Sequence, residues 1–254
     1  MTQTQPTNFY LSRIKLFDGI PKNALGGLKS VCTLEEVSAR TRISVPPRTL
    51  LAIHGGRVYR VSPDNEAVMT HWGHAGDLLG LSDMTSESST YVCAAPTLLT
   101  RLPVSGLAEL AKICELGLWQ RIAEMTAVEA AALARRATSL ILYPLPRRLA
   151  LALVDLIPHS QETDRGWEVF VTHQELAWRT GATRESISAV LAKFEAIDVL
   201  RRESRAILLC NAARLERLAL GTMDVDAMVD KAQKGKQWAR DAAERTGRRV
   251  RIAV

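Results

Sequence analysis

Residues 172–197, THQELAWRTGATRESISAVLAKFEAI, predict two capped helices joined by a tight turn. Thr172 and Glu175 form the S/T-x-x-E pattern of a capping box, in which each side chain accepts a hydrogen bond from the other residue's backbone amide. Gly181 ends the first helix, because glycine readily adopts the positive φ angle that this position requires. Thr183 then stands where it can cap the second helix. The stretch therefore predicts a helical hairpin.

The second helix of this hairpin has two chemically different sides. Apolar residues recur at helical spacing on one side, at Ile187, Val190, Leu191, Phe194 and Ile197. The other side carries short polar residues and alanines, namely Glu185, Ser188, Ala189, Ala192 and Ala196, with Arg184 in the first turn. A side of this kind fits the major groove of DNA, whereas many capped helical hairpins have no such role.

The residues after the hairpin favour the DNA-binding interpretation. Val199 and Leu200 lead into a segment with three arginines, and a strand-like run follows at residues 206–210. This pattern predicts a β-hairpin wing, whose arginines would contact phosphates. The arginines are Arg201, Arg202 and Arg205.

Upstream, residues 1–105 predict a β-rich domain. Short runs of β-like sequence, such as residues 57–61, 67–72, 91–95 and 98–102, are separated by turn residues, with a turn expected at 63–66. Many short strands at close spacing are typical of a sandwich or barrel.

Residues 106–142 predict a long helix with an approximate heptad repeat. Such a repeat is typical of a helix paired across a dimer, and the alternative is a helix packed on its own domain. The repeat consists of Leu116, Trp119, Ala123, Thr126, Ala130, Leu133 and Ala137. Pro144 and Pro146 then interrupt the helix and predict a hinge. Residues 143–220 form the expected DNA-binding domain.

Residues 221–254 predict a C-terminal extension. A helix is expected at 224–246, interrupted at Gly235, and Arg248, Arg249 and Arg251 make the end basic. Three interpretations stay open: a solvated or disordered tail, extra contact with the DNA backbone, or a cover for the β-rich domain.

Composition narrows the class of protein only modestly. The net charge of +6 and pI near 9.3 favour polyanionic partners, although many cytosolic enzymes have a similar surplus. The four cysteines form no CxxC pair, so no zinc or iron–sulfur site is expected. Neither a signal peptide nor a membrane span is expected, and the protein is expected in the cytoplasm.

The hairpin closely resembles the recognition motif of the cAMP receptor protein/FNR (CRP/FNR) transcription regulators. The resemblance is carried by Leu176, Ala177, Gly181 and the run from Thr183 to Ser188, and is weaker in the first 90 residues or so. It implies an α+β fold with an N-terminal cyclic-nucleotide-binding-like β-barrel (jelly roll), a long dimerisation helix and a C-terminal winged helix-turn-helix. It also implies a homodimer that binds a palindromic DNA site and contacts RNA polymerase, with no catalytic role.

The resemblance also implies the residues that contact DNA. Arg184 matches a reader of guanine and Glu185 a reader of cytosine, whereas Ala189 departs from an arginine common in the family, so the half-site sequence is left open. The complete expected set is Thr172, Thr183, Arg184, Glu185, Ser186, Ser188, Ala189, Arg201, Arg202 and Arg205.

The expected effector pocket departs from the cyclic-nucleotide pattern. Leu81 stands where those relatives have a glutamate, and Ser82 to Thr90 contains no arginine to pair with a cyclic phosphate, so cAMP is not the expected effector. The candidate pocket residues are Gly76, Asp77, Leu78, Gly80, Leu81 and Leu133.

No cofactor is firmly implied by the sequence. A haem-dependent gas or redox sensor is one alternative, with an axial ligand drawn from His54, His71, His74 or Cys93. An architectural winged-helix protein that binds DNA without an effector is another. An enzyme is not expected, because no catalytic triad, phosphate loop or metal-ligand set is evident.

Overall fold

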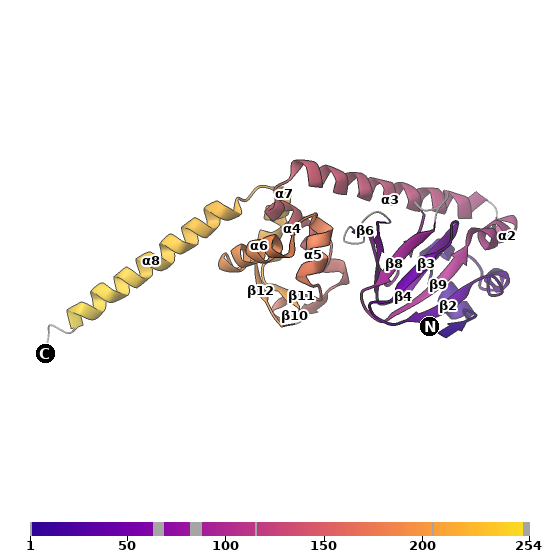
Figure 1. The fold of residues 1–254 in the computed structure, drawn as a ribbon, viewed down its shortest axis with the longest axis horizontal. Coiled ribbons are helices and arrows are strands. Elements are labelled where there is room, and N and C mark those ends of the chain that lie inside the picture. The colour runs from indigo at the N-terminus through magenta and orange to yellow at the C-terminus, as the bar shows by residue number, and fades with distance from the viewer. Residues whose placement is uncertain (1, 63–68, 82–87, 115, 205, 251–254) are drawn as a thin grey trace. The chain divides into compact units, whose positions relative to one another are not determined.

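The computed structural model describes residues 2–62, 69–81, 88–114, 116–204 and 206–250 (Figure 1). The chain forms two compact units, Met1–Ala137 and Thr138–Val254. In the described part of the chain, no helix combines the length and apolar character needed to cross a bilayer.

Unit 1 is built around two antiparallel sheets. Their orders are β1-β2-β9-β4-β7 and β3-β8-β5-β6. The strands are β1 (Thr2–Thr4), β2 (Thr33–Val37), β3 (Arg42–Val45), β4 (Thr49–Gly55), β5 (Arg57–Val61), β6 (Met69–His74), β7 (Leu78–Leu79), β8 (Ser89–Cys93) and β9 (Thr97–Pro103). The expected β-barrel is therefore confirmed, while the turn expected at 63–66 lies outside the described residues.

Strand β4 shows how this unit buries both faces of one sheet. Leu51 and Ile53 belong to the core between the two sheets, while Leu50 and Ala52 belong to a second core under the helices. Successive side chains of a strand point to opposite faces. The unbroken apolar run of β4 therefore indicates that both of its faces are buried. The covering elements are α1 (Asn8–Leu11), η1 (Lys15–Phe17), η2 (Ala24–Leu28), α2 (Val104–Cys114) and α3 (Leu116–Leu142).

Two helices occupy the stretch for which one long helix was expected. Helix α2 begins at Val104 and packs against η2 and β9, so it belongs to the β domain. Helix α3 packs one side on the same domain through Leu118, Ile122 and Met125. It ends at Leu142, just before the expected break at Pro144.

Unit 2 is a winged helix-turn-helix domain. Its sheet has the order β10-β11-β13-β12. The elements are α4 (Leu145–Val154), η3 (Ile157–His159), β10 (Gln161–Thr163), β11 (Gly166–Val169), α5 (His173–Thr180), α6 (Arg184–Ala196), β12 (Leu200–Arg202), β13 (Ile207–Leu209), α7 (Ala212–Leu220) and α8 (Val225–Val250). Together the two units confirm the expected α+β fold.

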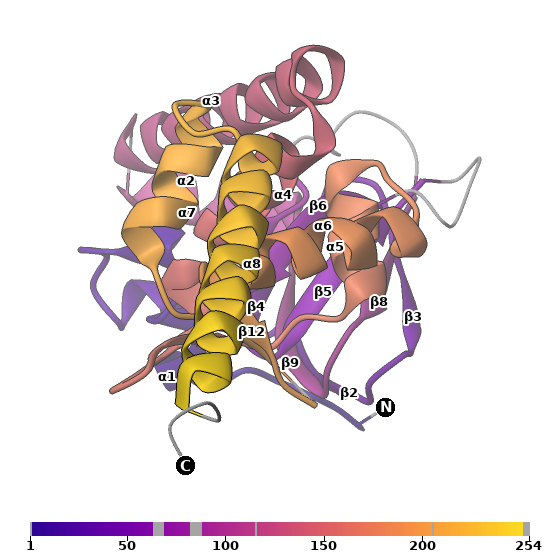
Figure 2. The ribbon, with the colours of Figure 1, turned by 90° about the vertical axis from the view of Figure 1, so that its left-hand side faces the viewer.

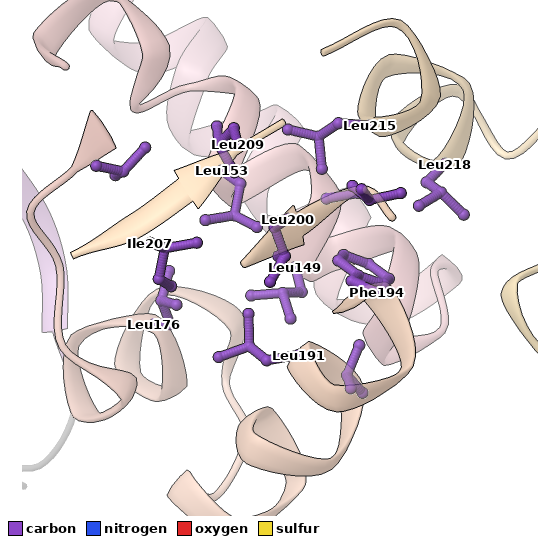
Figure 3. Packing of buried hydrophobic residues seen from close by; sticks show 14 of the residues in the cluster. Leu149, Leu153, Leu176, Leu191, Phe194, Leu200, Ile207, Leu209, Leu215 and Leu218 are labelled. Atoms are coloured by element: carbon purple, nitrogen blue, oxygen red, sulfur yellow. The ribbon is translucent and has the colours of Figure 1, made fainter. Parts of the chain in front are cut away.

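One hydrophobic core joins the helices of unit 2 to its sheet (Figure 3). Leu149 of α4 and Leu176 of α5 meet Leu191 and Phe194 of α6, and Leu200 of β12 closes the cluster. All five side chains are fully buried. Because each fully buried side chain of this size contributes roughly 1.5–3 kcal/mol, the core holds α6 firmly in place.

Two features of unit 2 differ from the expectation. The hairpin β10–β11 was not expected; it turns at Gly166, whose φ of +128° suits glycine and whose added Cβ would collide with the Leu209 carbonyl. Helix α8 runs through Gly235 without the expected interruption (Figure 2). One glycine costs a helix only about 1 kcal/mol relative to alanine, which the flanking helix formers outweigh.

Candidate nucleic-acid interface

Helix α5 begins with the expected capping box. The Thr172 hydroxyl accepts a hydrogen bond from the Glu175 amide at 3.1 Å, and the Thr172 amide donates to Glu175 Oε2 at 2.6 Å. The Glu175 side chain is buried, which protects this arrangement from water. The Thr172 hydroxyl, a predicted DNA contact, is thus already engaged in holding the helix start.

The turn between α5 and α6 depends on Gly181 and Ala177. Gly181 is in the left-handed conformation, with φ 62° and ψ 44°. The Ala182 amide donates to the Ala177 carbonyl at 3.0 Å and completes the helix end. Ala177 is buried, so its small side chain lets the two helices cross closely. The expected helix-turn-helix geometry is confirmed.

Helix α6 presents the expected side to solvent. Thr183 caps its first turn by accepting from the Ser186 amide at 3.2 Å. Arg184, Glu185 and Ala189 are exposed. The opposite, apolar side is buried at Ile187, Val190, Leu191 and Phe194. The polar side of α6 is therefore free to meet base edges in a groove.

Ser188 is only half-exposed, because its hydroxyl joins the two helices. The hydroxyl donates to the Arg184 carbonyl at 2.9 Å and lies 2.9 Å from Nδ1 of His173 on α5. Since the single hydroxyl proton is used on the carbonyl, His173 Nδ1–H is the donor of the second bond. Burial, and then the charges of Arg202 and Arg184, lower the pKa of His173.

The wing is a two-stranded hairpin that carries exposed arginines. Strands β12 and β13 pair antiparallel, and the Glu203 amide donates to the Ala206 carbonyl at 2.9 Å at the tip. Arg201 and Arg202 are exposed, as a phosphate contact requires, while Arg205 lies outside the described residues.

Glu195 of α6 holds Arg202 in place. The guanidinium donates to Glu195 Oε2 at 2.6 and 2.9 Å, and the Arg202 amide donates to Oε1 at 3.1 Å. Burial would raise the pKa of Glu195, but the bonds from Arg202 and the charge of Arg201 outweigh it, so this pKa is lowered. Part of the Arg202 charge is thus neutralised within the protein, which leaves Arg201 as the stronger candidate for a phosphate contact.

Sequence reasoning missed the roles of His173 and Glu195. His173 is separated from Ser188 by fifteen positions and Glu195 from Arg202 by seven, each across a turn. No periodicity or motif links such pairs, so only the packing of α5, α6 and β12 brings them together.

The predicted effector residues divide into two groups. Gly76, Asp77, Leu78 and Leu81 line a pocket of unit 1, whereas Gly80 and Leu133 are not among its lining residues. Gly80 instead forms a tight turn with φ +94°, where an added Cβ would lie 3.0 Å from the Thr49 carbonyl oxygen.

The charges around this pocket disfavour an anionic ligand. Its lining includes the carboxylates Asp77, Glu124 and Glu129, and Lys15 is its one cation among the described lining residues. No arginine occurs between Ser82 and Thr90 in the sequence. A cyclic phosphate buried here would lack the cationic partner that it needs.

Three of the four candidate haem ligands are hydrogen-bonded or buried within the β domain. His54 Nε2 lies 2.8 Å from Thr100 Oγ1, His74 is buried, and Cys93 is buried in the hydrophobic core between the sheets. The side chain of His71 lies outside the described part. Among the described residues, no group of three or more His, Cys, Asp or Glu side chains could hold a metal ion.

Five of the seven predicted dimer residues form an exposed stripe on α3. Trp119 is 43% and Leu133 36% exposed, and Ala123, Ala130 and Ala137 are also exposed. Thr126 is half-buried, and the side chain of Leu116 lies outside the described residues. At about 100° per residue, this stripe lies about a quarter turn from the side that packs on the β domain.

Comparison with known proteins agrees with this architecture. The family model of the Crp-like helix-turn-helix domain matches residues 147–218. A search of curated protein sequences finds no match.

Solved structures of CRP/FNR regulators share the fold. A CRP-family regulator from Thermus thermophilus has TM-score 0.61 and 24% identity, covering 73% of this chain and 96% of that chain. FixK2 from Bradyrhizobium japonicum has TM-score 0.65 and 18% identity, with coverage of 74% and 96%. The c-di-GMP responsive regulator CLP from Xanthomonas campestris has TM-score 0.58 and 20% identity, with coverage of 74% and 99%. The resemblance noted in the sequence is confirmed.

Proposed function

We propose that this chain, whose C-terminal unit contains a Crp-like helix-turn-helix domain and whose fold is that of the CRP/FNR regulators, controls transcription by binding a palindromic DNA site as a homodimer. The observation that carries the proposal is the outward-facing polar side of α6, held by two capped helix starts and a buried apolar side. By resemblance to the family, RNA polymerase is the further partner.

Base reading is assigned to the first turns of α6. Arg184 has the geometry to donate two hydrogen bonds to guanine, and Glu185 can accept from the amino group of cytosine. The hydroxyl of Ser186 lies 3.0 Å from that of Thr183, so these two residues support the helix start beside the bases. Arg201 of the wing supplies a backbone contact that does not depend on sequence.

Dimerisation is assigned to the exposed stripe of α3. An apolar side chain as large as that of Trp119, 43% exposed on a long helix, is expected to find a partner surface. A second copy of α3 fits, because the stripe repeats at the spacing of a coiled-coil seam and is centred on small residues. In a symmetric dimer, two copies of α6 would read half-sites about one helical turn of DNA apart.

An effector other than a cyclic nucleotide is assigned to the acidic pocket of unit 1. CLP is described as responsive to c-di-GMP, a ligand that carries phosphates. The carboxylates Asp77, Glu124 and Glu129 instead favour a neutral or cationic molecule here.

Selection of bound sequences from random duplex DNA tests the proposed function. Purified full-length protein should enrich one inverted repeat with half-sites about 10 base pairs apart. Enrichment of no sequence over the starting pool, with salt-dependent binding retained, would favour the architectural alternative. Failure to bind any duplex at low salt would refute both.

A further inference from the structure

The net positive charge of this protein comes from one short segment. Residues 231–254 contain eight of the 33 Lys and Arg residues but two of the 27 Asp and Glu residues. The remaining 25 basic and 25 acidic residues cancel, so this segment accounts for the whole net charge of +6. Its basic residues are Lys231, Lys234, Lys236, Arg240, Arg245, Arg248, Arg249 and Arg251.

The first turns of α8 anchor this segment next to the recognition helix. Val225 is buried in the core of unit 2, and Met228 and Val229 pack against the same core. Asp226 Oδ1 accepts from Lys193 Nζ of α6 at 2.6 Å. A charged segment therefore leaves the domain from a root that contacts the helix assigned to base reading.

Beyond this root, the helix faces solvent. Lys231, Lys234 and Lys236 are exposed, and Trp238 is 75% exposed. Lys231, Lys234 and Trp238 lie on one side, because residues three, four and seven apart share a helix face. Between Gln233 and Ala239, the last part of α8 whose side chains are described, the lysines thus lie in water rather than against the domain.

The chemistry of the exposed part indicates what it binds. A helix that enters a membrane surface needs an apolar face, and Trp238 is the single large apolar residue between Lys231 and Ala239. Pairing with a second α8 would bring two segments of like charge together without a seam of large apolar residues. A polyanion meets neither difficulty, and the helix beside the root is α6, to which base reading is assigned.

We propose that α8 from Lys231 onward is a basic arm that binds the phosphate backbone of duplex DNA next to the site read by α6. This inference rests on the proposed function and adds to it a sequence-independent contact. The arm raises affinity for all duplexes and extends the DNA covered by each protomer, while α6 supplies the choice of site.

The test compares two variants with equal loss of charge. Lys231→Gln/Lys234→Gln/Lys236→Gln removes three charges from the arm, and Lys22→Gln/Lys29→Gln/Lys112→Gln removes three from unit 1. Binding of full-length protein to a non-specific duplex is measured by fluorescence anisotropy between 50 and 200 mM salt, after circular dichroism shows that both variants are folded. Each phosphate that the arm no longer neutralises should lower the slope of log affinity against log salt by about 0.9.

If each of the three lysines neutralises one phosphate in both protomers of the proposed dimer, the slope falls by about 5.4, so the decrease in affinity over this fourfold rise in salt becomes about 2000-fold smaller. The unit 1 variant should keep the wild-type slope. The proposed arm would be refuted if all three proteins had equal salt slopes, or if both variants lost the same amount of slope. This holds even if α6 still selects its site. An unchanged slope accompanied by binding of the wild type to vesicles of anionic lipid would replace DNA with a membrane. A wild type that binds no duplex would refute the proposed function as well.

Discussion

His173 Nδ1 lies 2.9 Å from the hydroxyl oxygen of Ser188, and this contact joins the two helices of the helix-turn-helix. The same hydroxyl donates to the Arg184 carbonyl one turn earlier. A side chain of α5 is thereby connected to the turn of α6 that carries the guanine-reading candidate. Ser188, predicted to contact bases, also has a structural role.

Stability should depend on the protonation of His173. Its pKa in the folded protein is lowered by burial and by Arg202 and Arg184, whereas the unfolded chain takes up a proton near 6.5. The unfolded state therefore binds more protons between these two values, so stability falls as the pH drops below about 6.5 and levels off below the lowered pKa.

The variant His173→Asn keeps an N–H donor near the Nδ1 position but cannot be protonated. Thermal melts between pH 8 and pH 5 should show a smaller loss of Tm on acidification for the variant than for the wild type. Parallel curves for the two proteins would contradict the prediction, because the other histidines are common to both.

Replacing Arg184 and replacing Arg201 by alanine should change DNA affinity in different ways. Arg184→Ala should weaken binding to the selected site by about 1–3 kcal/mol and leave non-specific affinity nearly unchanged. Arg201→Ala should weaken binding to every duplex alike and reduce the salt slope by about 0.9 per protomer, which is about 1.8 for the proposed dimer. Titrations of both variants on the selected site and on a scrambled duplex measure the difference. A uniform loss for Arg184→Ala would argue against base reading.

The stripe on α3 should determine the oligomeric state. Leu133→Glu places a charge within the stripe, so the dimer should dissociate at micromolar concentrations, because a buried unpaired charge costs several kcal/mol. Val128→Glu is the matched control, since Val128 is 68% exposed and lies on the opposite side of the helix. Sedimentation velocity should show monomers for the first variant and dimers for the second. Monomeric wild type would exclude this interface.

Gly181 should tolerate a side chain poorly. Its φ of 62° costs an alanine about 1–2 kcal/mol, and the new Cβ would lie 2.9 Å from Leu140 Cδ2. Because the Leu140 side chain is 39% exposed, its end can move, and the backbone conformation should dominate the cost. Urea unfolding of Gly181→Ala, with and without Leu140→Ala, separates the two contributions. If Leu140→Ala fully restored the free energy of unfolding lost in Gly181→Ala, the contact with Leu140, and not the backbone conformation, would account for the cost.

Local patterns in the sequence predicted much of unit 2. The capping box of Thr172 and Glu175, the turn at Gly181 and the apolar side of α6 each depend on residues within one or two turns of helix. The hairpin β10–β11 escaped prediction, because its strands are only three and four residues long and acquire their partner from β13, some 40 positions away.

The amino-acid sequence was enough to predict where α5 and α6 begin and end, which side of α6 is apolar, and that the net positive charge lies after residue 230. Three contacts became visible in the folded chain alone: Glu195 binds Arg202, His173 binds Ser188, and Asp226 at the start of α8 binds Lys193 of α6. The two groups differ in how far apart along the chain the interacting residues lie. Capping and amphipathicity act between neighbours in the chain, whereas these charge and hydrogen-bond pairs exist once the buried core has brought separate elements together.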